Sequence, residues 1–117
     1  MAYIHTRYSS FLEQRTSIRI LLKEIHEAVR HTGVTSNEPI IVGAETVSTY
    51  VFNGTEHQEF CRITIDLDRS YDDAQLQTLG EQVTSAITNQ LQPVLQTTSL
   101  HISVKIVGFS PAFYFSS

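Results

Sequence analysis

The feature that most constrains the fold is a strand–helix–strand order that occurs twice along the chain. The first half, about 2–52, has a strand over Ala2–Tyr8, an amphipathic helix and a long segment rich in Ile, Val and Thr. The second half, about 59–107, repeats the order. Such crossovers are right-handed, so the two strands of each half run parallel and the helices share one sheet face. We predict an α/β (α+β) β-α-β-β-α-β fold with a four-stranded mixed sheet, in a single domain over 1–117 with a C-terminal tail.

Local signals give expected helix ends. Ser10-x-x-Glu13 and Ser70-x-x-Asp73 have the pattern of residues that open a helix, and Gly33 can take the left-handed conformation that closes the first one. Pro93 is expected either to end the second helix or to kink it. The apolar positions of the first helix recur at helical spacing; they are Leu12, Ile18, Leu21, Leu22, Ile25 and Val29.

Turn and strand signals are also present. Gly43-Ala44 favours a bulge or a close approach of another backbone, and Asn53-Gly54 is typical of a hairpin turn. Cys61 alternates with polar residues on the apolar side of the third strand, over Cys61–Leu67, which predicts a buried, inert thiol. The fourth strand is expected over Leu100–Ile106, and the aromatic tail, Phe109–Phe115, is expected to dock on another surface.

The predicted sheet has one uncovered face. The second strand carries Ile, Val and Tyr on both sides, so we expect another subunit to bury that face. The sequence thus favours an oligomer.

Composition excludes several classes of protein. Eight Lys and Arg against twelve Asp and Glu give a net charge of −4, and no cationic cluster suggests nucleic-acid binding. No apolar run approaches the ~20 residues that span a bilayer, and the first residues resemble no secretory signal. We expect a cytoplasmic protein that binds neither nucleic acid nor membrane.

The polar residues that could carry chemistry each have two possible interpretations, and none of them defines a site. Asp66 and Asp68 suit either a hard cation or a solvated strand end, and we favour the strand end. Glu56, His57 and Glu59 suit either an acid–base pair or a polar loop tip, the second being favoured. His5 and Arg7 suit either an anionic ligand or an interface. We therefore assign no metal and no cofactor.

Several segments together resemble the 5-carboxymethyl-2-hydroxymuconate isomerase family, trimeric members of the tautomerase superfamily. The matching pieces are Val47-Ser48-Thr49-Tyr50, the Asn53-Gly54 turn, Arg69-Ser70 and the tail residues Ile106, Pro111 and Phe115. The resemblance runs from Ala2 to Phe115. It implies a tautomerase-like fold, a homotrimer and a role in the degradation of aromatic compounds.

The family's chemistry implies site residues here. An N-terminal proline acts as general base in that family, whereas this chain has Ala2, whose amine becomes terminal when Met1 is removed. Arg69 matches a carboxylate-binding arginine, and Tyr50 is expected to form part of the pocket wall. The strand arginines of the family are replaced by Ile40-Ile41-Val42-Gly43.

Two functions follow from the resemblance. One is a cofactor-free tautomerase that acts on a small unsaturated keto or enol acid with fewer carboxylates than the family's usual substrate. The other is a catalytically inactive family member that binds a small ligand or acts in assembly. Retention of Met1 would count against any mechanism that uses the Ala2 amine.

Overall fold

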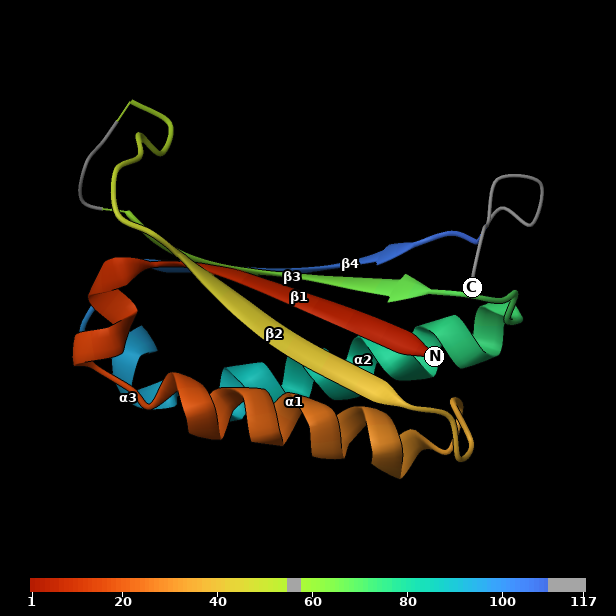
Figure 1. Ribbon diagram of the computed structural model, residues 1–117. Helices are drawn as coiled ribbons and strands as arrows, with labels where there is room; N and C mark the ends of the chain where they lie inside the picture. Colours follow the sequence, from red (N-terminus) through yellow and green to blue (C-terminus); the bar gives the residue numbers. More distant parts are fainter. Residues whose placement is uncertain (55–57, 110–117) are drawn as a thin grey trace.

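The computed structural model describes residues 1–54 and 58–109 and has the predicted order of elements (Figure 1). The tail beyond Phe109, including Pro111 and Phe115, and the residues Glu56 and His57 lie outside the described part. The elements are β1 (Ala2–Ser9), a short 3-10 helix (Ser10–Gln14), α1 (Ile18–Thr32), β2 (Ile40–Val47), β3 (Glu59–Leu67), α2 (Asp73–Gln90), α3 (Gln92–Leu95) and β4 (Leu100–Val107).

The four strands form one mixed sheet in the order β2-β1-β3-β4. β1 runs parallel to β2, β3 runs parallel to β4, and the two halves join through the antiparallel pair β1 and β3. Both long helices lie on the same side of the sheet (Figure 1). The predicted fold class is confirmed, with each half forming a parallel crossover unit.

The core lies between the sheet and the two long helices. Alternate residues of β1 and β3 point into it, because successive side chains of a strand face opposite sides. α1 contributes Leu21, Ile25 and Val29 from one stripe. Cys61 belongs to this core with no exposed surface, so its predicted burial is confirmed. Burial raises the pKa of its thiol to about 12.

Both long helices begin later than the sequence signals suggested. Ser17 caps α1 by accepting a hydrogen bond from the Ile20 amide, and Asp72 caps α2 in a reciprocal capping box with Gln75. Ser10 instead opens the 3-10 turn that leads the chain away from β1. Ser70 lies before α2, which begins at Asp73. The predicted caps were therefore wrong in position, although the helices themselves are present.

Four other local expectations have different outcomes. Gly33 closes α1 in the left-handed conformation, with φ of 71°, as predicted. Gly43 pairs in unbroken register with His5, so the expected bulge is absent. Asn53 and Gly54 both have positive φ, but β1 lies between β2 and β3, so their turn does not form a hairpin. Pro93 sits in the first turn of α3, so α2 has already ended, at Gln90.

The uncovered face of the sheet is more polar than expected. Tyr3 and Ile41 are its large exposed apolar residues, and they are direct partners across β1 and β2. Arg7 and Arg62 face each other across β1 and β3, with Glu45 3.7 Å from Arg7. Within the described residues, no helix is long and apolar enough to cross a membrane.

Candidate active site

Three segments that are distant in the sequence meet at the sheet edge where β1 begins. β2 is parallel to β1, so its first residue, Ile40, lies opposite Ala2. β3 is antiparallel to β1, so its last residue, Leu67, lies on the other side of Ala2. The residues just before β2 and just after β3 are therefore brought to the N-terminus (Figure 1).

Ala2 is fixed in this arrangement as part of the sheet. Its side chain is fully buried, and its backbone N–H donates to the carbonyl of Pro39 at 3.1 Å. Met1 precedes it, and the Met1 ammonium donates to Glu38 Oε2 at 2.7 Å and to Asp68 Oδ1 at 2.8 Å. The terminal amine thus lies between two carboxylates.

Arg69 lies at the same edge and shares one of these carboxylates. Its Nη1 is 2.8 Å from Glu38 Oε1, and its Nε donates to the Tyr71 hydroxyl at 3.0 Å. The guanidinium carbon lies 5.2 Å from the centre of the Tyr71 ring, within reach of a cation–π contact. The structure therefore brings two of the three expected site residues, Ala2 and Arg69, to one edge, where Glu38 bridges the terminal amine and the arginine.

The electrostatics of the amine depend on this bridge. Partial burial lowers the pKa of the Met1 amine, but hydrogen bonds to Asp68 and Glu38 outweigh it, so the pKa is raised above the usual value of 8.0. The Arg69 pKa is also raised, first by its hydrogen bond with Tyr71. With Met1 in place, the amine is protonated at neutral pH and has no lone pair with which to accept a proton.

Tyr50 lies beyond the end of β2, whereas Ala2 pairs with Ile40 at its start, so the two residues are at opposite ends of the sheet. β2 runs alongside β1, and the eight residues of β1 span about 25 Å. The Tyr50 hydroxyl donates to Glu59 Oε2 at 3.1 Å, and its ring packs edge-on against Phe60. Within one chain, Tyr50 does not join Ala2 and Arg69; it lines a separate hollow of about 360 Å³.

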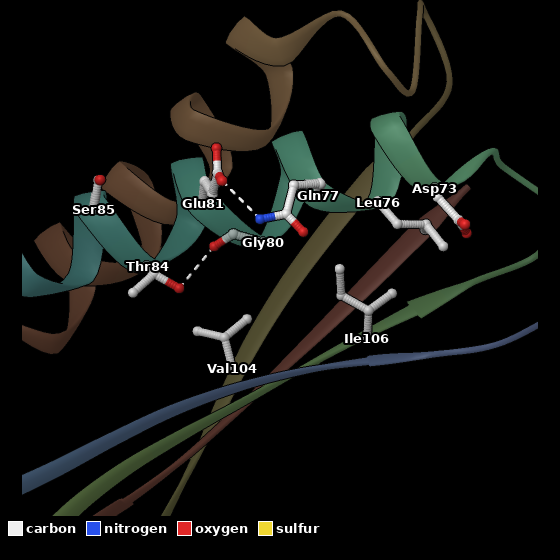
Figure 2. Close-up of a pocket in the computed structure, with 9 residues that line it drawn as sticks. All are labelled: Asp73, Leu76, Gln77, Gly80, Glu81, Thr84, Ser85, Val104 and Ile106. Atoms are coloured by element: carbon white, nitrogen blue, oxygen red, sulfur yellow. Dashed lines mark hydrogen bonds between the residues drawn. The ribbon is translucent and has the colours of Figure 1, made fainter.

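Two larger surface hollows differ in their relation to this edge. One, of about 540 Å³, lies between the end of α1 and the loop before β2, and is bordered by Glu38 and Pro39. The other, of about 890 Å³, lies between α2 and β4, where Leu76, Val104 and Ile106 are its apolar residues (Figure 2). Neither Ala2 nor Arg69 lines either hollow, but Glu38, which contacts Arg69 and the Met1 ammonium, borders the smaller one, so we assign the candidate site to the edge near Glu38.

The other candidate polar residues from the sequence lie in different parts of the structure. Asp68 contacts the Met1 ammonium, whereas Asp66 lies on the uncovered sheet face with His5 and Arg7. In residues 1–54 and 58–109, no group of three or more His, Cys, Asp or Glu side chains is arranged to hold a metal ion.

Sequence reasoning missed Glu38 and Tyr71. A signal for Glu38 was available, because a residue just before a strand parallel to β1 must lie near the start of β1.

Comparisons with known proteins agree with the fold. The profile of the 5-carboxymethyl-2-hydroxymuconate isomerase family matches residues 2–117. A solved 5-carboxymethyl-2-hydroxymuconate delta-isomerase has 18% identity and a TM-score of 0.82, covering 100% of this chain and 87% of the other. A 5-carboxymethyl-2-hydroxymuconate isomerase from Deinococcus radiodurans R1 has 16% identity and a TM-score of 0.88, covering 99% and 88%.

A more distant structural neighbour carries information on assembly. It is a fused 4-OT described as a symmetric trimer, with 12% identity and a TM-score of 0.60, covering 97% of this chain and 94% of the other. No curated protein matches the chain in sequence. The structural similarities establish a tautomerase-like fold, and the profile match covers almost the entire sequence. The chain therefore belongs to the 5-carboxymethyl-2-hydroxymuconate isomerase family.

Proposed function

We propose that this protein is a cofactor-free tautomerase that moves a proton between carbons of a small unsaturated keto or enol acid. The observation that carries the proposal is the meeting of the N-terminus and Arg69 at one edge of the sheet, in a chain that belongs to an isomerase family. A base and a carboxylate-binding cation are the two groups that this reaction requires.

The proposed base is the amine of Ala2 after removal of Met1. An ordinary α-amino group has a pKa of about 7.7–8.0, so a useful fraction is neutral near pH 7. The neutral amine takes a proton from a carbon of a keto acid, or from the hydroxyl of an enol acid, which leaves a dienolate, and the resulting ammonium returns the proton to a carbon of the dienolate. Strand pairing on both sides of Ala2 supplies the fixed geometry that the missing proline ring would otherwise provide.

Arg69 is proposed to bind the substrate carboxylate. It projects from the loop between β3 and α2 and remains about half exposed, with its side chain at 47% of full exposure. Tyr71 holds the guanidinium by one hydrogen bond, and Glu38 Oε1 lies 2.8 Å from Nη1, where a ligand carboxylate would bind in its place. The substrate would gain electrostatic stabilisation as its negative charge develops.

We also propose that the protein is a cytoplasmic homotrimer. The uncovered sheet face offers surface for association, as do the outer edges of β2 and β4, which have no neighbouring strand within residues 1–54 and 58–109; a structural neighbour is a symmetric trimer. Because Tyr50 lies about 25 Å from Ala2 along the sheet, it can line a substrate pocket only at the Ala2 of another copy.

A second candidate function is an inactive family member that binds a ligand or acts in assembly. It is favoured by the contacts of Met1, whose ammonium fills the space between Glu38 and Asp68 at the start of β1. A chain that keeps Met1 would present a protonated amine one residue away from the expected position.

The two functions are separated by ultraviolet-monitored ketonisation of a 2-hydroxymuconate-type dienol acid. Lys23 and Lys105 are the two lysines of the chain and both are exposed, so K23R/K105R leaves the terminal amine as the remaining primary amine. Met1-free K23R/K105R protein should accelerate ketonisation over buffer, and acetylation of its single amine should remove that acceleration. A folded, Met1-free protein that matches the buffer rate would contradict the tautomerase proposal.

A further inference from the structure

The carboxylate of Glu38 already pairs with Arg69, the carboxylate-binding cation of the proposed site, and also with the Met1 ammonium when Met1 is retained. One oxygen, Oε2, lies 2.7 Å from the Met1 ammonium, and the other, Oε1, lies 2.8 Å from Arg69 Nη1. A substrate carboxylate bound by Arg69 would make this same contact with the guanidinium. Glu38 thus stands where a carboxylate of a ligand would stand.

The backbone holds Glu38 in this position from both sides. Its N–H donates to the carbonyl of Thr35 at 3.1 Å, which closes a turn before the strand. Pro39 follows it and restricts its backbone to extended conformations, while the Pro39 carbonyl accepts from Ala2. The contact between Glu38 and Arg69 does not involve Met1, so we expect it to persist when Met1 is removed.

A second carboxylate adds to the negative charge of this edge. Asp68 lies next to Arg69 in the chain and bonds the terminal ammonium at 2.8 Å. Glu38 and Asp68 thus place two negative charges at the edge that holds Arg69, and a neutral Ala2 amine, as the base must be, adds no positive charge to offset them. A ligand with one carboxylate has to compete with Glu38 for Arg69, and a ligand with two meets further repulsion from Glu38 and Asp68.

We propose that Glu38 is a specificity-determining residue that pairs with Arg69 in place of a substrate carboxylate and so selects against dicarboxylates. The inference rests on the proposed function, because it assigns the substrate class of the same site. The preferred substrate carries one carboxylate and is uncharged at its other end. This selection also accounts for a strand, Ile40–Gly43, that carries no arginine to receive a second carboxylate.

The test measures binding, so it does not depend on turnover. Sorbate and trans,trans-muconate share the same conjugated diene and differ by one carboxylate, and their dissociation constants are measured by calorimetry on Met1-free protein. Glu38→Gln keeps the shape of the side chain and removes its charge, which should tighten muconate binding about tenfold, the change expected when a competing charge-assisted hydrogen bond is lost. Sorbate should tighten less, so the ratio of the two constants should move toward muconate.

Three control variants identify the cause of any gain. Glu45→Gln removes the same charge from an exposed carboxylate that is 3.7 Å from Arg7 on the uncovered sheet face, and it should leave both constants unchanged. In Glu38→Gln combined with Arg69→Met, the gain should disappear, because Arg69 is the group that Glu38 frees. Glu38→Ala should reproduce the gain if removal of the carboxylate, rather than a new glutamine contact, is responsible.

Several results would overturn the inference. These are an unchanged muconate-to-sorbate ratio in both Glu38 variants, an equal gain in Glu45→Gln, a gain that survives loss of Arg69, or no binding of either acid to any variant. The tautomerase proposal has a separate outcome, because a protein that fails to accelerate ketonisation can still show the predicted shift in binding ratio. Failure of one proposal is therefore distinguishable from failure of the other.

Discussion

The protonation of the terminal amine couples the stability of the Met1-retaining chain to pH. The folded pKa of this amine is raised above its usual value of 8.0, mainly because hydrogen bonds to Asp68 and Glu38 outweigh the opposing effect of burial. A raised folded pKa gives a stabilisation that is complete below about pH 8 and is lost as pH rises through the folded value. Thermal unfolding of Met1-retaining protein should therefore show a midpoint that decreases above pH 8.

A charge-neutral variant isolates this contribution. In Met1-retaining E38Q/D68N, both acceptors of the ammonium lose their charge, so the midpoint should decrease less between pH 8 and pH 10. Intact mass confirms that Met1 is present. An identical slope in the parent and the variant would assign the pH dependence to other groups.

Cys61 should be unreactive in the folded protein. It is fully buried, and burial raises its pKa to about 12, so the thiolate is scarce at neutral pH. A chromogenic disulfide reagent at pH 8 should label the native protein only at the rate of its unfolding, whereas protein in denaturant should react at once with one thiol per chain. Rapid labelling of native protein would mean that Cys61 is accessible.

At the scale of elements, Gly80 lies inside α2 and offers a stabilising substitution. A Cβ added there would lie 3.7 Å from Ile106 Cδ1, an ordinary van der Waals contact with β4. Ala in a helix interior is favoured over Gly by about 0.5–1 kcal/mol. Gly80→Ala should raise the free energy of unfolding by about this amount in urea titrations.

Gly33 provides the matched substitution with the opposite sign. It closes α1 with φ of 71°, a conformation that alanine adopts only with strain. Gly33→Ala should therefore destabilise the protein by about 1 kcal/mol. A loss of stability in both variants would indicate that the contact between α2 and β4 is tighter than its geometry suggests.

The sequence predicts elements better than it predicts their ends. Alternation in β3 and the helical stripe of α1 each repeat over many residues, so a single exception does not hide them. A cap depends on one side chain and one amide, and several residues near each helix start can satisfy the pattern. Ser10 matched it, but Glu13 instead accepts a hydrogen bond from the Tyr8 hydroxyl at 2.5 Å.

At the scale of the whole molecule, the uncovered sheet face should join copies of the chain. We expect sedimentation equilibrium to give three times the chain mass of 13.2 kDa. Tyr3 and Ile41 form the exposed apolar pair on this face, at 39% and 43% exposure. Tyr3→Glu with Ile41→Glu should dissociate the oligomer by placing paired charges there.

A control for this variant lies on the helix layer. Ile20 is similarly exposed, at 47%, but it lies on α1, away from the uncovered sheet face. Ile20→Glu should leave the mass unchanged. A monomeric parent protein, or an intact trimer in the double variant, would contradict the proposed interface.

The site was predictable in part, because two kinds of information are needed to locate it. The family resemblance identified Ala2 and Arg69, which lie about 67 positions apart and meet only because β3 returns antiparallel to β1. Glu38 belongs to no sequence motif. It contacts both the Met1 ammonium and Arg69 because of the order of the strands in the sheet. A single sequence can indicate which side chains are able to carry chemistry. Which of those side chains form ion pairs with one another is harder to predict from it.

The buried position of Ala2 at the first rung of the sheet has a practical consequence for handling the protein. An affinity tag fused before Ala2 would replace the amine with an amide and would have to leave the sheet past Glu38 and Asp68. Protein prepared in that way can fold and still lack the proposed base. Assays should therefore use material whose first residue is Ala2 itself, verified by mass before any rate is interpreted.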